Sequence, residues 1–167
     1  MGPTMIRALT IAAVLLTPVP VLAQAARDNL PVPRFVSLRS EEVNLRTGPG
    51  VRYPVEWVFV RRQMPVEITQ EFENWRRVRD REGTEGWVHQ SMLTGRRTAV
   101  VLGDAGTLVE LKRRAETAAP GLARVEAGVI ANLIECQGDW CRVEAGGFRG
   151  WLERTHIWGV YAQETLK

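Results

Sequence analysis

The sequence contains few of the residues from which most active sites are built. Its 167 residues include only two histidines and two cysteines. His89 and His156 each follow a Gly-Trp-apolar stretch, and neither stands beside a Ser or Cys motif that would form a nucleophile–base pair. Cys136 and Cys141 lack the C-x-x-C spacing of zinc and redox sites. The sequence therefore predicts a protein that is not an enzyme and has no catalytic residues, bound metal or cofactor.

An excess of charge of one sign is also missing. The chain carries 22 Lys and Arg against 19 Asp and Glu, a formal net charge of +3 at pH 7. Nucleic-acid binding calls for a concentrated basic patch or stripe, so we expect no nucleic-acid partner. The acidic pairs Glu41–Glu42 and Glu71/Glu73 fall in turn-like stretches, which is typical of solvated carboxylates rather than of a general acid/base pair.

Long hydrophobic runs are confined to the N-terminus. Residues 1–7 carry one positive charge, residues 8–21 are apolar but contain two prolines, and small residues stand at Ala23 and Ala25. The run is shorter than the ~20 residues that span a bilayer, and its layout is that of a secretory signal peptide. We expect removal of residues 1–23, with cleavage after Ala25 equally compatible. A flexible leader at 24–34 follows, and the mature protein is periplasmic or secreted, with no transmembrane segment.

The expected export of the protein bears on the state of its two cysteines. An even pair in an oxidising compartment is a disulfide candidate. A polar, glycine-containing turn separates Cys136 from Cys141, so a bridge across a hairpin is geometrically reasonable. The closed loop is short, and we expect a modest gain in stability.

Helical periodicity is scarce too. After the expected signal peptide, only a weak helical pattern occurs, near residues 108–119. Short apolar runs instead alternate with charged or glycine-containing turns, which predicts small all-β barrels. Val43–Arg46 is an alternating run that ends at Gly48 and Gly50, which we expect to supply positive φ. The dense apolar run at 57–60 is expected to be covered on both faces or to meet the core.

This succession of signals occurs twice. The matches are Val109–Lys112 with Val43–Arg46 at an offset of 66, Trp140 with Trp75 at 65, and Gly150-Trp151 with Gly86-Trp87 at 64. Three anchors in register predict a tandem repeat, with a first unit at 35–98 and a second at 104–162. The second copy lacks the glycines of the turn after the first run, so we expect its loop to take a different shape.

The chain resembles the bacterial SH3-like (SH3b) domain family in three motifs. They are Val43-Asn44-Leu45-Arg46-Thr47-Gly48-Pro49-Gly50, then Trp75 ahead of Arg77-Val78, then Gly86-Trp87-Val88. The resemblance is close over about 35–95 and looser over 106–160. It implies two small SH3-like, partly open β-barrels in tandem after a cleaved signal peptide. It also implies a binding module of the cell envelope, with peptidoglycan or its peptides as the partner.

Two loops of the first unit carry the candidate ligand-binding residues. These are Arg46, Arg52, Tyr53 and Trp57 near the first loop, and Glu73, Asn74 and Trp75 at a facing turn. Flat aromatic faces suit sugars or peptide backbone, and arginine forks suit the carboxylates of wall peptides. For the tryptophans, burial in the core is the alternative.

A second kind of function stays open at this point. Edge strands of an open barrel can accept an extra strand from another protein or from a second copy. If the edge strands are used in this way, the chain is a protein–protein adaptor whose partner is a periplasmic protein, or a module that associates with itself. Exposed aromatics around one loop groove favour wall binding, and a long apolar open edge favours the adaptor.

Overall fold

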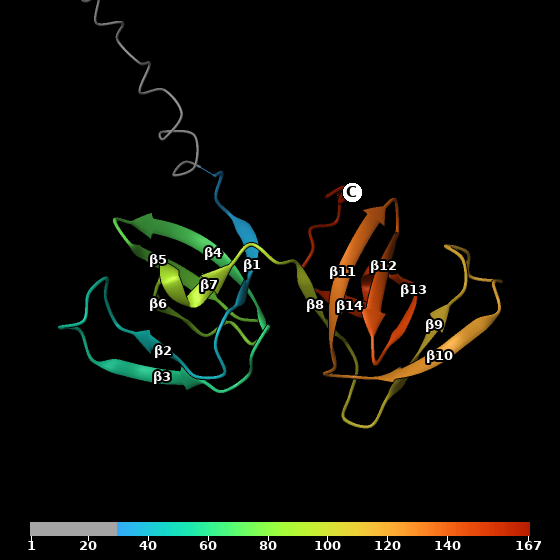
Figure 1. Ribbon diagram of the computed structural model, residues 1–167, viewed down its shortest axis with the longest axis horizontal. Coiled ribbons are helices and arrows are strands. Elements are labelled where there is room, and N and C mark those ends of the chain that lie inside the picture. Colours follow the sequence, from blue (N-terminus) through green and yellow to red (C-terminus); the bar gives the residue numbers. More distant parts are fainter. Residues whose placement is uncertain (1–29) are drawn as a thin grey trace, which may run out of the picture. The chain divides into compact units, whose positions relative to one another are not determined.

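The computed structural model describes residues 30–167, and these residues form two β-sheets (Figure 1). The first sheet contains β1 (Arg34–Leu38), β2 (Val43–Arg46), β3 (Val55–Phe59), β4 (Pro65–Phe72), β5 (Trp75–Arg79), β6 (Glu85–His89) and β7 (Leu93–Thr94). The second contains β8 (Thr98–Val101), β9 (Leu108–Lys112), β10 (Gly121–Glu126), β11 (Ile130–Gln137), β12 (Trp140–Ala145), β13 (Phe148–Glu153) and β14 (Ile157–Trp158). The 3₁₀ turns η1 (Gln90–Met92) and η2 (Arg154–His156) precede β7 and β14.

The N-terminal expectations fall largely outside this region. The expected signal peptide at 1–23 and most of the leader at 24–34 lie outside the described residues. Within the described part of the chain, no helix is both long and apolar enough to cross a membrane.

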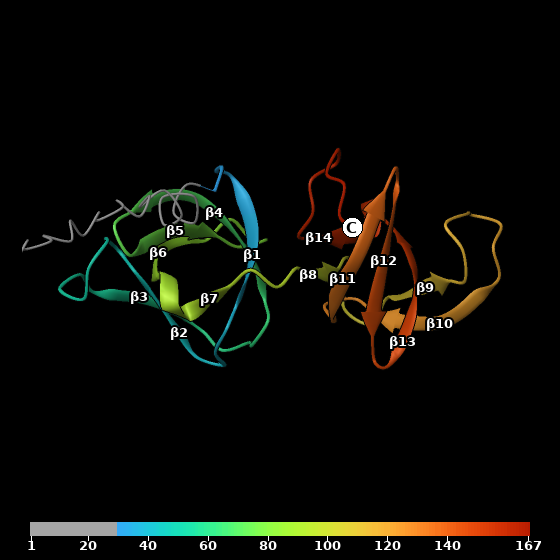
Figure 2. The ribbon, with the colours of Figure 1, turned by 45° about the horizontal axis from the view of Figure 1, so that its top comes forward.

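The two sheets have the same topology, which confirms the tandem repeat. The strand order is β3-β2-β6-β5-β4-β1-β7 in the first and β10-β9-β13-β12-β11-β8-β14 in the second, with antiparallel pairing throughout. Each sheet curls around its own core (Figure 2). A single residue pair, Arg46 with Trp87, joins β2 to β6, and Lys112 with Trp151 joins β9 to β13. The first barrel (β1–β7) and the second barrel (β8–β14) are therefore partly open, as expected.

Alternating side chains build each core. Val43 and Leu45 are buried while Asn44 between them is exposed, as the pleat of a strand requires. Gly86 shows why the Gly-Trp motif recurs: a Cβ there would lie 2.5 Å from Leu45 Cγ. Gly150 stands in the same relation to a leucine of β9, at 2.6 Å. In both barrels only glycine lets the sheet close at this point.

The apolar run at 57–60 departs from expectation. Trp57 is 57% exposed, Val60 is 74% exposed, and only Phe59, at 3%, is buried in the core. Residues 57–59 of the run lie on β3, which ends the strand order and has β2 as its one neighbour in the sheet. The alternative of two covered faces is wrong because an edge strand of a single curled sheet has nothing packed on its outer side, whereas the alternative that the run meets the core holds through Phe59.

The loops after β2 and β9 also correct the sequence analysis. Neither Gly48 nor Gly50 is among the residues with positive φ. Both loops have the same three backbone hydrogen bonds, at positions 66 residues apart. In the first loop they are Thr47 N to Pro54 O, Gly50 N to Gly48 O and Tyr53 N to Gly50 O. In the second loop they are Arg113 N to Pro120 O, Glu116 N to Arg114 O and Ala119 N to Glu116 O. The expectation of a different loop shape is wrong because no left-handed residue is needed at these positions.

The second sheet begins earlier than the range 104–162. Its first strand, β8, occupies Thr98–Val101, inside the stretch in which we expected the boundary. Ala99 and Val101 are completely buried in the second core, and this burial explains why the strand belongs to the sheet. The connection between β7 and β8 is thereby reduced to residues 95–97.

The expected disulfide is confirmed. Cys136 on β11 pairs directly with Cys141 on β12, and their Cα atoms are 4.1 Å apart. The first barrel has an ion pair at the same register position, with Arg76 Nε 2.9 Å from Glu71 Oε1. The disulfide of the second barrel thus occupies the position of an ion pair in the first barrel.

Residues 31–167 form one compact unit. Phe35 of the first barrel packs against Trp158 and Tyr161, with ring centroids 5.0 and 4.7 Å away. The Tyr161 hydroxyl donates to Glu67 Oε1 at 2.8 Å. The segment after β14 therefore contacts the first barrel through both aromatic and polar groups.

Candidate functional site

A surface groove lies between the loop after β2 and the turn that joins β4 to β5. We call it the first groove, and it is lined by Pro49, Gly50, Val51, Arg52, Phe72, Glu73, Asn74, Trp75 and His89. It brings together four of the seven predicted binding residues, namely Arg52, Glu73, Asn74 and Trp75.

The turn side of the first groove is held by its own hydrogen bonds. Glu73 adopts a φ of 48°, which turns the chain sharply between β4 and β5. Asn74 accepts a hydrogen bond from the Gln90 side chain at 2.9 Å. Trp75 lies directly opposite His89 on β6, and their rings meet edge to face with centroids 5.3 Å apart. The aromatic wall of the groove is therefore fixed by sheet register.

The loop side contributes a positive charge. The Arg52 guanidinium lies over the Tyr53 ring, 5.2 Å from its centroid, and donates a long hydrogen bond of 3.4 Å to the Tyr53 hydroxyl. Arg52 is exposed, and none of the ion pairs found among residues 30–167 involves it. Its guanidinium is therefore available to an anionic ligand at the rim of the groove.

Three predicted binding residues do not line the first groove. Arg46 donates hydrogen bonds to the carbonyl oxygens of Val51 and Tyr53, at 3.2 and 2.8 Å, and so closes the loop. Tyr53 packs on Gly48, where a Cβ would lie 2.5 Å from the tyrosine ring. Trp57 lies exposed on the edge strand β3. Arg46 and Tyr53 thus shape the loop, and Trp57 belongs to a different surface.

Sequence reasoning missed five of the nine groove residues, and two of the five, Phe72 and His89, carry aromatic rings. Phe72 is 51% exposed at the end of β4, and His89, for which we expected no catalytic role, is the cross-strand partner of Trp75. The signal that finds His89 is register: once Trp75–Arg79 and Glu85–His89 form a hairpin, the first residue of one strand faces the last of the other.

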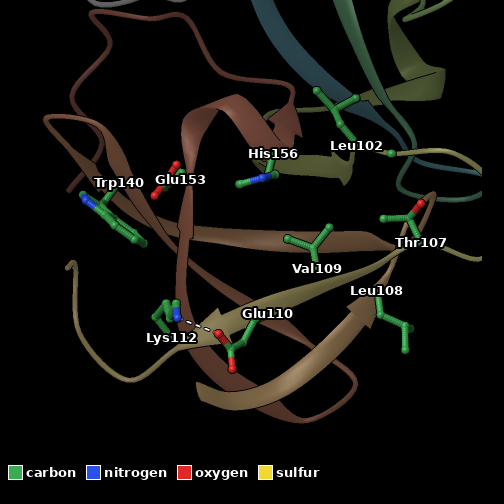
Figure 3. A pocket seen from close by; sticks show the side chains of 10 residues that line it. Leu102, Thr107, Leu108, Val109, Glu110, Lys112, Trp140, Glu153 and His156 are labelled. Atoms are coloured by element: carbon green, nitrogen blue, oxygen red, sulfur yellow. Dashed lines mark hydrogen bonds and ion pairs between the residues drawn. The ribbon is translucent and has the colours of Figure 1, made fainter. Parts of the chain in front are cut away.

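The second barrel has a pocket at a related place, which we call the second pocket (Figure 3). It is lined by Leu102, Gly103, Thr107, Leu108, Val109, Glu110, Lys112, Trp140, Glu153 and His156. Trp140 and Glu153 form a register pair between β12 and β13, as Trp75 and His89 do between β5 and β6. From this shared pair the second pocket extends along β9, whereas the first groove extends toward the loop after β2.

Charges in the second pocket are only partly satisfied. Lys112 Nζ lies 2.5 Å from Glu110 Oε2, and this hydrogen bond, together with the charge of Lys112, lowers the pKa of Glu110. Glu153 accepts long hydrogen bonds of 3.5 Å from the hydroxyls of Thr117 and Thr155. Glu153 therefore retains most of its capacity to bind a donor.

No group of three or more metal-ligating side chains occurs within residues 30–167. The expectation that the protein is not an enzyme and binds no metal or cofactor stays a prediction.

Comparison with known proteins returns distant structural similarities. No curated protein sequence matches the chain. The structures of NlpC2 and NlpC1 from Trichomonas vaginalis are each 12% identical to it, with TM-scores of 0.36 and 0.35. The matches cover 81% and 84% of this chain but 51% and 50% of those proteins. The chain therefore spans about half the length of the solved structures it matches.

The family comparison is more extensive. A model of the bacterial SH3 domain matches the chain twice, at residues 39–95 and 105–159. The first match covers most of the sheet β1–β7 and the second most of β8–β14. Each contains the loop after its second strand, the hairpin tryptophan and the Gly-Trp closure. The chain therefore belongs to the bacterial SH3 domain family, in two tandem copies.

Proposed function

We propose that the protein is an exported, non-catalytic binding module of the cell envelope, and that its first groove binds peptidoglycan or its peptides. Membership of the bacterial SH3 domain family supports a cell-wall-associated role. The observation that carries the proposal is the juxtaposition of an unpaired arginine and a register-fixed tryptophan, Arg52 and Trp75, in one groove.

The chemistry of the first groove suits such a ligand. Wall peptides present carboxylates, which an arginine fork binds through two parallel hydrogen bonds. Phe72 and Trp75 offer flat faces to sugar rings or peptide planes. Asn74 and Glu73 stand at the exposed turn, where their side chains can bond to amide groups. The groove thus combines one charged anchor with an aromatic wall and polar groups.

Co-sedimentation with purified peptidoglycan sacculi tests this proposal. We expect the protein to pellet saturably, and Arg52→Ala to weaken pelleting about tenfold because one charge-assisted bidentate contact is lost. Arg62→Ala is the matched control, since Arg62 is an exposed arginine of the first barrel that does not line the groove. Equal loss in both variants, or protein that stays in the supernatant, contradicts the proposal.

The edge strand supports a second candidate function. β3 is an open edge, and Val55, Trp57 and Val58 on it are all exposed. Exposed apolar edges are templates for an added strand from another chain. The adaptor function is therefore favoured by a specific feature of the first barrel. It predicts that ligands contact β3 rather than the first groove.

A further inference from the structure

The two barrels present the same tryptophan with different partners. In each, the first residue of the fifth strand lies directly opposite the last residue of the sixth. The pair is Trp75 with His89 in the first barrel and Trp140 with Glu153 in the second. Side chains at directly opposed positions lie on one face within contact distance. The copies therefore carry an imidazole and a carboxylate, respectively, beside an equivalent indole.

The two partners also differ in how they are engaged. His89 Nδ1 lies 2.7 Å from Ser91 Oγ, and the imidazole also accepts from the Ser91 backbone N–H as the cap of η1. Glu153 precedes η2 in the same way but makes no capping hydrogen bond. Its carboxylate receives only the two long hydroxyl contacts of 3.5 Å. The second barrel thus keeps an under-used acceptor where the first has a satisfied side chain.

Charge balance identifies the kind of group that this acceptor would take. Two carboxylates, Glu110 and Glu153, line the second pocket against one ammonium, Lys112. Lys112 already forms an ion pair with Glu110. Among residues 30–167, none of the ion pairs involves Glu153, which lies beside Trp140 (Figure 3). A cation at this point gains both a carboxylate and an aromatic face.

We infer that the second pocket is a binding site for a primary ammonium group, held between the Trp140 indole and the Glu153 carboxylate. A protonated amine donates charge-assisted hydrogen bonds to a carboxylate and is attracted to the face of an indole within about 6 Å. The exposed Leu108 lines the opposite end of the same pocket from Trp140 and Glu153 (Figure 3). This inference goes beyond the function proposed for the first groove and does not depend on it.

Titration with small amines tests the site. The probes are Nα-acetyl-L-lysine amide, which has a side-chain amine, and L-alanine amide, which has an α-amine, with Nα,Nε-diacetyl-L-lysine amide as the uncharged reference. Binding to the full exported chain is followed by the NMR signal of the Trp140 indole N–H. We expect at least one amine to shift this signal saturably and the diacetylated compound to leave it unchanged. The amine that binds more tightly identifies a side chain or a chain terminus as the source.

Substitutions separate this site from general electrostatics. Glu153→Gln keeps the shape of the side chain, and we expect binding about tenfold weaker because a charge-assisted contact is lost. Glu153→His, which installs the pair of the first barrel, has the same expected effect. Glu135→Gln is the control, because Glu135 is a partly exposed carboxylate of the second barrel that lies outside the pocket and forms an ion pair with Arg142.

Two results overturn the inference: equal binding of the diacetylated compound, or an equal loss in Glu135→Gln and Glu153→Gln. Unchanged signals from the other five tryptophan indoles verify that the variants are folded. No sacculi are used, so a failure of this site and a failure of wall binding through Arg52 are separately visible.

Discussion

At the scale of single residues, the two loops after β2 and β9 show how one backbone path accommodates different side chains. The first loop has Gly48 beneath the ring of Tyr53. The second has Arg114 and Ala119 at the equivalent positions, with Ala119 buried. In the first loop the small residue is Gly48 and the large one is Tyr53, whereas in the second loop the large residue is Arg114 and the small one is Ala119. Space below the ring, and not backbone freedom, explains the glycine.

This explanation predicts a coupling between Gly48 and Tyr53. Gly48→Ala places a Cβ within 2.5 Å of the tyrosine ring, and we expect a loss of about 1–3 kcal/mol in the free energy of unfolding from overpacking. In a Tyr53→Ala background the same substitution is expected to cost much less, since the ring is gone. Urea unfolding of the two single variants and the double variant measures the coupling.

Gly95→Ala is the control for this cycle, because a Cβ at Gly95 meets nothing within 4 Å. An equal cost of Gly48→Ala with and without the tyrosine ring would show that the glycine serves the backbone after all.

At the scale of elements, the segment after β14 joins the second barrel to the first. The Arg97 guanidinium pairs with Glu164 and also donates to the Gly159 carbonyl. Arg154 donates to the carbonyls of Tyr161 and Glu164. Burial raises the pKa of Glu164, but the hydrogen bonds from Arg97 and from the Tyr161 N–H outweigh it, so the net shift is downward. Two arginines and one carboxylate thereby hold the segment in place.

The Tyr161 hydroxyl predicts a pH dependence of stability. Burial, and then the hydrogen bond to Glu67 with its charge, raise the pKa of Tyr161 well above its usual range. The unfolded tyrosine ionises near pH 10, while the folded one stays protonated. The contribution of the Tyr161 hydroxyl to the free energy of unfolding is therefore fully present below about pH 10 and is lost as the pH rises above it. Tyr161→Phe is expected to remove this part of the alkaline loss, as measured by urea unfolding at pH 9 and pH 11.

Tyr53→Phe is the control for the alkaline experiment, because Tyr53 is the other tyrosine of the sequence. An alkaline loss of stability in Tyr161→Phe as large as in the unsubstituted chain would contradict a role for the Tyr161–Glu67 contact.

The elements themselves were largely predictable. Alternation and turn residues predict Val43–Arg46 with the bounds the structure has. Local pattern does not report which strand stands at a sheet edge, and for this reason the apolar residues of β3 were expected to be covered. The strand at Thr98–Val101 was missed because it lies in a stretch whose only local signal is a short apolar run beside arginines.

The candidate site was predictable only in part. Arg52, Glu73, Asn74 and Trp75 were found because turn residues with aromatic or charged side chains are adjacent in the sequence to strand ends. The register partner His89 requires the hairpin pairing. The second pocket extends along the face of β9, where alternation predicts an exposed side but does not predict a hollow.

At the scale of the whole molecule, one fold occurs twice with two different surfaces around the hairpin tryptophan. The strand order, the loop hydrogen bonds and the closing glycine are shared. The partner of the hairpin tryptophan differs, as do the residues around it. The first barrel therefore presents an arginine-bearing groove and the second a carboxylate-bearing pocket.

The most direct test of the central claim is residue-level mapping of a bound wall peptide. Backbone NMR shifts of the full chain would be recorded during titration with a soluble peptide released from peptidoglycan. We predict shifts concentrated at residues 49–52 and 72–75, with His89 among them, and their loss in Arg52→Ala. Shifts concentrated at residues 55–60 on β3, or no saturable shift in the first barrel, would contradict wall binding through the first groove.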